Sequence, residues 1–330
     1  MTVATLRRRL RLIALLLLYA SVAGLAASTV LAEFGEEWWI ADLFAHFRYH
    51  YVLGALLLAA IAVALGRRGA SVAAACLVLP QLWAVAAPPR TPEAPRASAH
   101  ASVRVMSVNV LWSNRRYDDV VRAVEREAPD VLALQEITPQ WHAVVDRLAA
   151  RLPHVAPAGW RMQRSDNVLL SRFPITESRV VVPPNQYRPF AHVEATLAVN
   201  GKSVRVLAVH PPLPAGPIHT AIRQANFDYY AKLAAETELP LLIVGDFNIT
   251  PYSPRFRALL RDGGLRYVHL GWNWPRSWPS ASHCCLNRYI RGFPIDHVLT
   301  SRHFAAVSGQ ALEDIGSDHY PVRADLLLLR

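Results

Sequence analysis

Six strand-like apolar runs have amide, carboxylate or imidazole side chains at their ends, and these are groups that bind metal ions or transfer protons. In LLIVGDFN, for example, four aliphatic residues are followed by Gly245 and then by Asp246 and Asn248. In an extended stretch these two side chains point to the same side, towards one ligand. One such residue is common in a turn, but six endings indicate a shared site. The residues are Asn109, Glu136, His210, Asp246, Asn248, Asp296, Asp318 and His319.

These side chains suit the hydrolysis of a phosphate ester. Asn109, Glu136 and Asp318 offer oxygen atoms to Mg²⁺, which prefers one or two carboxylates together with water and phosphate oxygens. A carboxylate beside a histidine can orient the ring and favour its charged form. Such a site positions its substrate, stabilises charge and activates a water molecule. A zinc site is not expected, because the three cysteines form no Cys-x-x-Cys pattern.

Taken together, the motifs resemble those of the endonuclease/exonuclease/phosphatase superfamily. This superfamily includes DNase I-like nucleases, inositol-polyphosphate phosphatases and neutral sphingomyelinases. The matching pieces lie in the family's order across residues 103–330, and the set is specific although GDFN alone is not. They are SVNV at 107–110, LQE at 134–136, LLSRFPI at 169–175, VHPP at 209–212, GDFN at 245–248, IDHVLTS at 295–301 and SDHYPV at 317–322.

The resemblance implies a metal site. Asn109 and Glu136 would sit at the metal, and Asp318 would support the metal or its water. Mg²⁺ is the expected ion, with Mn²⁺ as the alternative. Asp166 and Asn167 precede a strand where some members of the family place site residues, but turn chemistry explains these two residues equally well.

The resemblance also implies how the substrate is attacked. Asp246 would orient or deprotonate the attacking water, and Asn248 would bind the phosphate. His210 would donate to a phosphate oxygen. His319 would stabilise the charge that develops on the phosphorus oxygens, with Asp296 as its carboxylate partner.

The elements that position these residues predict an α/β fold. Asn200–Gly201 joins two strand-like runs and is a strong hairpin signal, because both residues tolerate a positive φ. Many strands with a few helices imply a four-layer α/β sandwich, in which two mixed β-sheets are flanked by helices. The expected strands are 103–110, 130–136, 167–170, 179–182, 190–199, 202–209, 240–245, 295–300, 307–312 and 320–328, and the expected helices are 117–127, 141–152, 220–236 and 253–261.

The N-terminal part has a different character. Hydrophobic residues make up 52% of the chain and charged residues 18%, which leans towards a membrane protein, and the apolar excess lies in residues 12–87. Residues 12–32 are uncharged and long enough for a bilayer core of about 30 Å. A cleaved signal peptide is the competing interpretation of this run. We predict a membrane anchor at residues 1–87 with about three transmembrane helices, at 12–32, 51–66 and 70–87.

The distribution of arginine predicts the orientation of this anchor. LRRRLR at 6–11 and Arg67–Arg68 would lie in the cytoplasm under the positive-inside rule. The catalytic domain, residues 103–330, would then lie on the periplasmic or extracellular side of a bacterial-type cytoplasmic membrane. Loss of the short second span would reverse the side. The Pro- and Ala-rich residues 88–102 read as a linker.

The substrate is the least determined part of the prediction. The net charge of +10 suits nucleic acid, lipid headgroups or phosphate esters, although genome composition explains the arginine bias equally well. Within 266–294, aromatic residues alternate with arginine, and we expect Arg276, Trp278 and Arg288 to bind substrate. The alternative is a loop that packs on itself.

Three functions remain open at this stage. The first is hydrolysis of a phosphate ester or pyrophosphate of a lipid or envelope metabolite, because a domain held beside a bilayer meets such compounds most often. The second is an extracytoplasmic nuclease, with nucleic acid as its partner. The third is a non-catalytic membrane receptor for phosphorylated ligands. No protein partner is predicted.

Overall fold

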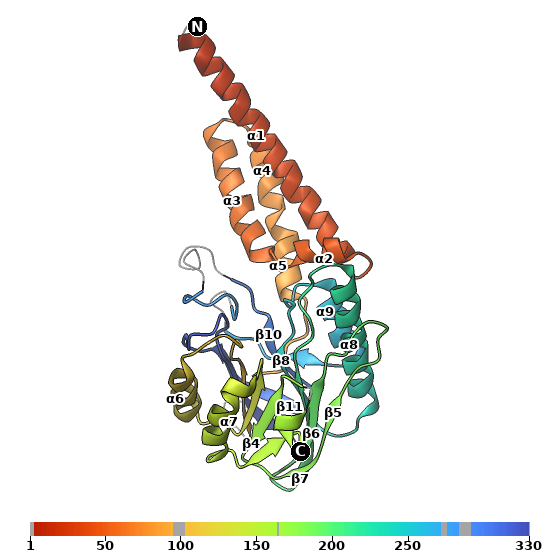
Figure 1. Ribbon diagram of the computed structural model, residues 1–330. Helices are drawn as coiled ribbons and strands as arrows, with labels where there is room; N and C mark the ends of the chain where they lie inside the picture. The colour runs from red at the N-terminus through yellow and green to blue at the C-terminus, as the bar shows by residue number, and fades with distance from the viewer. Residues whose placement is uncertain (1–2, 95–102, 164, 272–275, 284–291, 330) are drawn as a thin grey trace. The chain divides into compact units, whose positions relative to one another are not determined.

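The computed structural model describes all residues except 1–2, 95–102, 164, 272–275, 284–291 and 330 (Figure 1). Contacts divide the chain into two compact units. The helical unit comprises residues 1–88 together with Pro251–Arg257, and the α/β unit comprises Pro89–Thr250 and Ala258–Arg330.

The α/β unit contains two six-stranded mixed sheets, which confirms the predicted fold class. Only β1–β2 and β7–β8 pair in parallel, while the other neighbouring strands pair antiparallel. In order across the first sheet the strands are β11 (Phe304–Ala311), β12 (Val322–Leu328), β1 (Val103–Asn109), β2 (Val131–Gln135), β4 (Val168–Ser171) and β3 (His154–Ala156). In the second they are β5 (Ile175–Val181), β6 (His192–Val199), β7 (Lys202–Val209), β8 (Leu241–Asp246), β10 (Asp296–Thr300) and β9 (Arg266–Tyr267).

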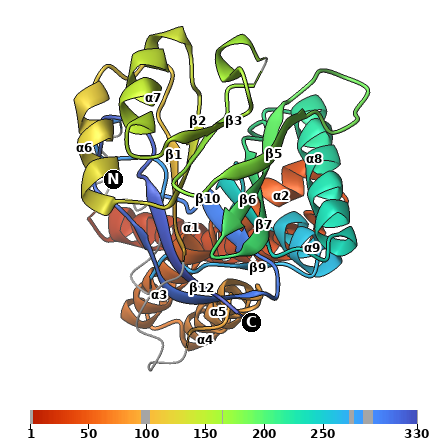
Figure 2. The ribbon, with the colours of Figure 1, turned by 90° about the horizontal axis from the view of Figure 1, so that it is seen from below.

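Helices cover the outer faces of the two sheets. Figure 2 shows α6 (Tyr117–Glu127) and α7 (His142–Ala149) on one side and α8 (Pro217–Glu236) on the other. The helix α9 (Pro254–Asp262) follows β8. The described residues also form three short 3₁₀ turns, η1 (Ala32–Phe34), η2 (Pro139–Trp141) and η3 (Trp160–Met162). The order helix, sheet, sheet, helix is the predicted four-layer sandwich.

Alternation along the strands explains why these layers pack. In β1, Val103 and Val105 face the core between the sheets, while Met106 and Val108 face the core beneath α6 and α7. Each buried Val or Leu contributes about 1.5–3 kcal/mol relative to an exposed one. The β6–β7 hairpin turns at Asn200–Gly201, whose φ angles are 49° and 81°, as predicted.

The pairing directions bring many strand ends to one end of the sandwich. The carboxyl ends of β1, β2, β7 and β8 meet the amino ends of their antiparallel neighbours, so that Asp246 of β8 lies opposite Asp296 of β10. We call this the site end. Its loops are residues 110–116, 136–141, 157–163, 165–167, 182–191, 210–216, 247–250, 276–283, 292–295 and 312–321.

Gly245 lets β8 approach β7 closely before the chain turns. Its φ is +154°, and a Cβ atom at this position would lie 1.9 Å from the carbonyl oxygen of Val209. We therefore expect Gly245→Ala to lower the free energy of unfolding by about 2–4 kcal/mol. Denaturant unfolding of the solubilised protein measures this. Gly159→Ala is the matched control, because Gly159 also has a positive φ but no atom within 4 Å of its Cβ position; an equal effect of the two substitutions would contradict the steric explanation.

Residues 89–94 are paired with the α/β unit. The amide of Thr91 donates to the carbonyl of Tyr267 at 2.9 Å, and the amide of Tyr267 donates to Pro89 at 3.1 Å. Further on, the amide of Ala306 donates to Pro92, and Ala94 donates to Ala306, both at 2.7 Å. The predicted linker therefore begins with an extended segment on β9 and β11, and residues 95–102 lie outside the described part.

The helical unit consists of α1 (Val3–Leu31), α2 (Trp39–Ala45), α3 (Arg48–Ala64), α4 (Arg68–Cys76) and α5 (Val78–Ala86), in addition to η1. Among the described residues, two helical stretches are long and apolar enough to cross a membrane, Val3–Phe34 and Arg68–Ala86. The α2–α3 pair, bent by 63°, is a third candidate if it counts as one span. Three spans were predicted, and two or three candidates are found.

A buried polar network joins three helices of this unit. The guanidinium of Arg48 is fully buried and donates to Gln81 at 3.2 Å and to the carboxylate of Glu33. The amide nitrogen of Gln81 donates to the hydroxyl of Thr29 at 2.7 Å. These side-chain contacts link α1 and η1 with α3 and α5.

Candidate active site

His319 and Asp296 form a buried pair at the site end. Nδ1 of His319 donates to Oδ2 of Asp296 at 2.8 Å, and Nε2 lies 3.6 Å from Oδ2 of Asp246. Burial alone would lower the pKa of His319, but the charges of Asp296 and Asp246 and the hydrogen bond to Asp296 raise it to about 10. Ser317 fixes the backbone at His319. Its hydroxyl accepts a hydrogen bond from the amide of His319 and donates one to the carbonyl of Asn109. The ring is therefore a fixed cation.

His210 and Asp166 form a second pair of the same kind. Nδ1 of His210 donates to Oδ2 of Asp166 at 2.9 Å, and Nε2 lies 3.7 Å from Oδ2 of Asp246. Burial acts to lower the pKa of His210, but the hydrogen bond and charge of Asp166, with the charges of Asp246 and Glu136, raise it to about 9. Asp166, which the sequence left open, thus belongs to the site. The sequence signal that identifies Asp166 is its position just before β4, because the amino end of this strand lies at the site end.

Asp246 is the centre of the arrangement. Its Oδ2 accepts a hydrogen bond from Nδ2 of Asn109 at 3.2 Å and is faced by both histidines. Its Oδ1 accepts the amide of Asn248 at 2.8 Å. Burial and, less strongly, the nearby Asp296 raise the pKa of Asp246 to about 6, although the two histidines oppose the shift. Such a carboxylate can accept a proton near neutral pH.

Two residues of the site have a left-handed backbone. Glu136 has φ 63° and Asn248 has φ 52°, and neither is glycine. Strain of this kind costs about 1–3 kcal/mol and persists where surrounding contacts hold it, often at functional sites. Around Asn248, the amide side chain donates to the carbonyl of Pro211 at 3.1 Å, and Arg223 donates to its backbone carbonyl at 2.6 Å.

The predicted metal residues lie in two places. Nδ2 of Asn109 donates to Oε1 of Glu136 at 3.0 Å, and the amide of Trp112 donates to Oε2 of Glu136 at 2.9 Å. Asp318 lies instead beside His319, with its Oδ1 4.0 Å from Nε2 of the ring. That Oδ1 is buried and has no hydrogen-bond partner among the described residues. The carboxylate oxygens of Glu136 and Asp318, one of them a buried atom without a hydrogen-bond partner, are hard donors that fit a Mg²⁺-like ion. Oδ1 of Asn109 accepts a hydrogen bond from the amide of Leu111 at 3.0 Å.

A second grouping also has the spacing of a metal site. Ligand atoms of Asp246, Asp296 and His319 all lie within 4.8 Å of one another. In this grouping, however, Nδ1 of His319 is already hydrogen-bonded to Asp296. We therefore favour Glu136 as the metal ligand and the His319–Asp296 pair as a charged donor.

Two of the predicted substrate-binding side chains, Trp278 and Arg276, contact other residues of the protein. The indole N–H of Trp278 donates to Oδ2 of Asp318 at 3.1 Å, and its ring stacks on Phe293 with centroids 6.3 Å apart. The guanidinium of Arg276 lies over the ring of Tyr320 at 5.1 Å. Arg288 lies outside the described residues. The structure therefore places Trp278 and Arg276 in contacts of the kind expected for a self-packed loop.

The segment 276–283 also holds the backbone of the site. The hydroxyl of Ser277 accepts the amide of Asp296 at 3.0 Å, and the amide of Tyr320 donates to the carbonyl of Ser277 at 2.7 Å. The amide of Ser280 donates to the carbonyl of Asp318, also at 2.7 Å. These residues fix Asp296, Asp318 and His319 relative to one another.

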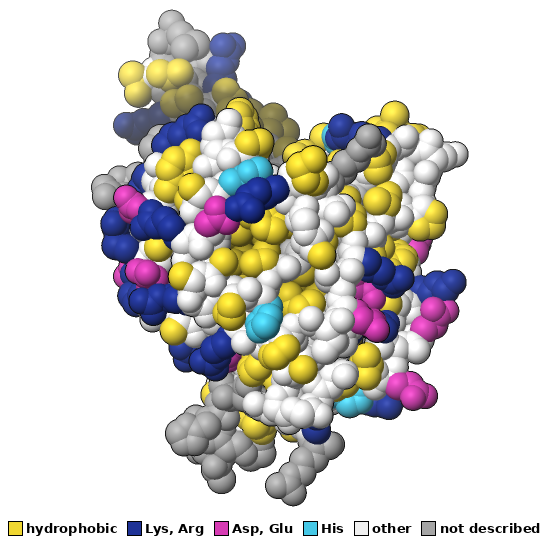
Figure 3. Space-filling view, turned by 60° about the horizontal axis from the view of Figure 1, so that its bottom comes forward, with side chains coloured by type: hydrophobic (Ala, Val, Ile, Leu, Met, Phe, Trp, Pro, Cys, Tyr) yellow, Lys and Arg dark blue, Asp and Glu magenta, His cyan; other side chains and the backbone are white. Residues whose placement is uncertain are grey.

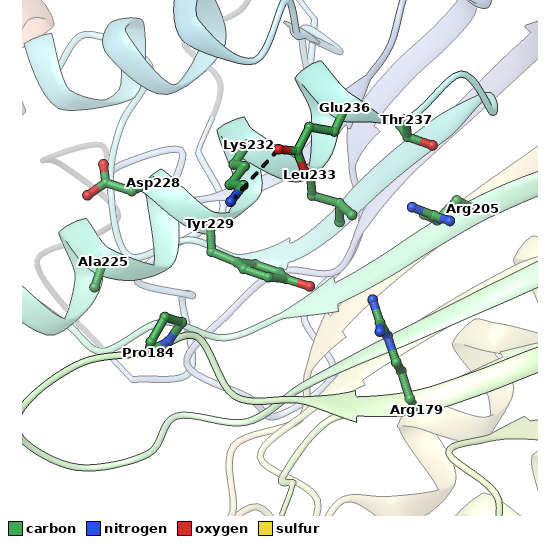
Figure 4. Close-up of a pocket in the computed structure, with 10 residues that line it drawn as sticks. All are labelled: Arg179, Pro184, Arg205, Ala225, Asp228, Tyr229, Lys232, Leu233, Glu236 and Thr237. Carbon is green, nitrogen blue, oxygen red and sulfur yellow. Dashed lines mark ion pairs between the residues drawn. The ribbon is translucent and has the colours of Figure 1, made fainter.

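A pocket of about 660 Å³ lies elsewhere, between α8 and strands of the second sheet (Figure 4). Four of its charged residues form ion pairs: Arg179 and Arg205 lie 2.9 and 3.6 Å from Glu194, and Lys232 lies 3.8 Å from Glu236. None of the motif residues lines it. This pocket is therefore separate from the candidate active site.

Comparison with known proteins agrees with this geometry. The sequence model of the Endonuclease/Exonuclease/phosphatase family matches residues 106–319, and the chain belongs to this family. Its members act on phosphodiester bonds, so the chain is a phosphoric ester hydrolase. A search of curated proteins returned no match.

Solved structures share the fold. An endonuclease/exonuclease/phosphatase from Beutenbergia cavernae is 22% identical over 69% of this chain and 72% of its own, with a TM-score of 0.54. A beta toxin variant from Staphylococcus aureus with bound magnesium ions is 15% identical over 68% and 99%, with a TM-score of 0.54. Sphingomyelinase C from Streptomyces griseocarneus is 18% identical over 67% and 98%, with a TM-score of 0.51.

Proposed function

We propose that the protein is a membrane-anchored, divalent-metal-dependent hydrolase of a phosphate ester or pyrophosphate carried by a lipid or envelope metabolite. The observation that carries this proposal is the convergence of three donors, Asn109, His210 and His319, on Oδ2 of Asp246. A phosphate group placed among them would meet two imidazolium rings and one amide, with a carboxylate ready to accept a proton.

The residues divide the reaction between them. Asp246 orients the attacking water and takes its proton, because its raised pKa of about 6 makes it a better base than an ordinary carboxylate. His319 and His210, each charged through its own carboxylate partner, hold the oxygens on which negative charge grows. The second N–H of the Asn248 amide is directed to the phosphate.

A divalent cation is part of the proposal. Glu136 and Asn109 would hold it, with the unpartnered Oδ1 of Asp318 as a further oxygen donor. When bound, it would supply positive charge to a phosphoryl oxygen. Mg²⁺ is proposed because the donors are hard oxygens and because a beta toxin of the same fold binds magnesium ions. Mn²⁺ is the alternative.

Two observations favour a lipid or lipid-linked substrate. The same chain carries apolar helices long enough to cross a membrane, and one protein of the same fold is a sphingomyelinase. In addition, basic and acidic side chains are interspersed on the face shown in Figure 3. That face therefore shows no continuous basic stripe of the kind that follows a nucleic-acid backbone.

The proposal includes the predicted orientation. Three spans, with the α2–α3 pair counted as one of them and the N-terminal arginines inside, would leave the catalytic unit on the outer side of the membrane. Reporter fusions at the C-terminus test this point: a reporter that is active only in the cytoplasm would overturn it.

A substrate panel tests the activity. The full chain in nanodiscs is offered sphingomyelin, phosphatidylglycerol, a lipid pyrophosphate, inositol phosphates and plasmid DNA, with Mg²⁺ or Mn²⁺. We expect turnover of a lipid that stops with EDTA and returns with either ion. Nicking of DNA without lipid turnover would instead identify a nuclease, and binding without turnover of any substrate would identify a receptor.

The Asp166–His210 pair gives a pH-dependent prediction. Asp166→Asn removes the carboxylate charge that helps to hold the pKa of His210 at about 9, so this pKa should fall. Since the charged ring is the active form, the alkaline limit of kcat/KM should move to lower pH, with activity at pH 6 reduced less than tenfold. Asp118→Asn, an exposed carboxylate on α6, should leave the profile unchanged. An unshifted alkaline limit in Asp166→Asn would remove His210 from the mechanism.

A further inference from the structure

Exposed large apolar side chains of the α/β unit gather at the site end. Among its described residues, eight such side chains are exposed, and six of them stand on site-end loops or directly beside them. These six form what we call the apolar rim: Trp112, Met162, Val182, Tyr187, Leu213 and Ile218. The other two, Val307 on β11 and Leu329 after β12, lie elsewhere.

The rim is built on the same segments as the catalytic residues. Trp112 is 62% exposed, yet its backbone amide donates to the carboxylate of Glu136. Leu213 is 55% exposed and follows His210 by three residues, in a loop whose Pro211 carbonyl accepts from Asn248. Ile218 follows in the first turn of α8. The apolar side chains therefore stand on the same loops as the catalytic residues.

Water-soluble surfaces rarely keep such a cluster unless it meets a partner. The chemistry of the rim fits a bilayer surface, where Trp and Tyr are enriched at the level of the headgroups. Exposed arginines accompany them: Arg115 follows Trp112 in the same loop, and Arg188 follows Tyr187. Arginine at this level attracts anionic headgroups.

The chain itself brings a bilayer within reach. It carries helices long enough to cross a membrane. Only Ala87 and Pro88 separate the end of α5 from Pro89, where pairing with β9 begins. These residues span at most about 10 Å of extended chain. A membrane that holds α5 would therefore keep the α/β unit near its surface.

We propose that the apolar rim inserts into the headgroup region of an anionic bilayer, so that a lipid headgroup enters the site without leaving the membrane. The role of insertion in catalysis rests on the proposed function, because it requires a substrate that is held in a membrane. Insertion itself does not require turnover, and the two can be tested separately.

Site-specific fluorescence tests the insertion. Cys76, Cys284 and Cys285 are replaced by Ser in the full chain, and Leu213→Cys is labelled with an environment-sensitive dye in phosphatidylglycerol nanodiscs. We expect a blue-shifted emission that lipids spin-labelled near the headgroup quench. Val307→Cys is the matched control and should show neither effect. Equal emission and quenching at both positions, or no quenching at Leu213→Cys, would overturn the proposal, the second outcome pointing to a protein partner.

Turnover separates this inference from the proposed function. For Leu213→Asp/Ile218→Asp, we expect the ratio of lipid turnover to turnover of bis-p-nitrophenyl phosphate to fall at least about tenfold. Val307→Asp should leave the ratio unchanged. If labelled Leu213→Cys is quenched but the parent protein turns over no lipid, the insertion of the apolar rim is supported and the proposed lipid substrate is contradicted. If the parent protein turns over lipid and the ratio is unchanged in Leu213→Asp/Ile218→Asp, the lipid substrate is supported and the insertion of the rim is contradicted.

Discussion

Asp246→Asn is expected to lower kcat by at least about 10³-fold while leaving the fold intact. The substitution keeps the shape of the side chain and its acceptor oxygen towards the amide of Asn248. It removes the negative charge that both histidines face and the carboxylate that we propose as the acceptor of the proton from water. Both the base and the electrostatic centre are lost together, so the effect should be the largest of any single substitution.

The measurement is single-turnover and steady-state hydrolysis of a soluble phosphodiester, with thermal unfolding as a check on folding. Asp228→Asn is the matched control, because Asp228 lies on α8 and lines the separate pocket. It should retain activity within about twofold. If Asp246→Asn kept more than a tenth of the parent activity, the assignment of the base would fail.

Asp296→Asn is the second large effect, expected to lower kcat/KM by about 10²–10⁴-fold. Asp296 supports His319 through the 2.8 Å hydrogen bond and its charge. Without that charge the pKa of His319, now about 10, should fall. The ring then loses its proton at lower pH, and the alkaline limit of activity should move down accordingly.

The kcat/KM profile between pH 5 and 10 distinguishes this from loss of structure. Asp296→Asn should regain part of its activity towards acid pH, where His319 is protonated again, whereas His319→Ala should not regain it at any pH. The same low activity at every pH in both variants would show that Asp296 has only a structural role.

The strands and the motif residues could be predicted because their information is local. Alternation in β1 and the turn residues at Asn200–Gly201 fix elements without reference to the rest of the chain. The convergence of Asn109, His210, Asp246 and His319 followed from their common position at strand ends. Strands β3 and β9 were missed, because two or three residues carry no periodic pattern.

What could not be predicted depends on contacts between distant segments. Asp166 contacts His210 across 44 positions, and neither residue's neighbours reveal that pairing. Trp278 is expected from composition to bind substrate, and the sequence gives no sign that its indole N–H donates to Asp318, which is 40 positions away. Sequence composition can suggest that an aromatic side chain is present for binding, but not which way it faces.

The segment 89–94 affects how the protein can be divided. It pairs with β9 and β11, which are the outermost strands of the two sheets. Unpaired edge strands are sites of aggregation, and proline protects them because it has no N–H to offer a further strand. With Pro89 and Pro92, this segment closes two edges and does not itself extend the sheets. A soluble form that begins at residue 103 should therefore aggregate, whereas one that begins at residue 89 should remain monomeric in light scattering.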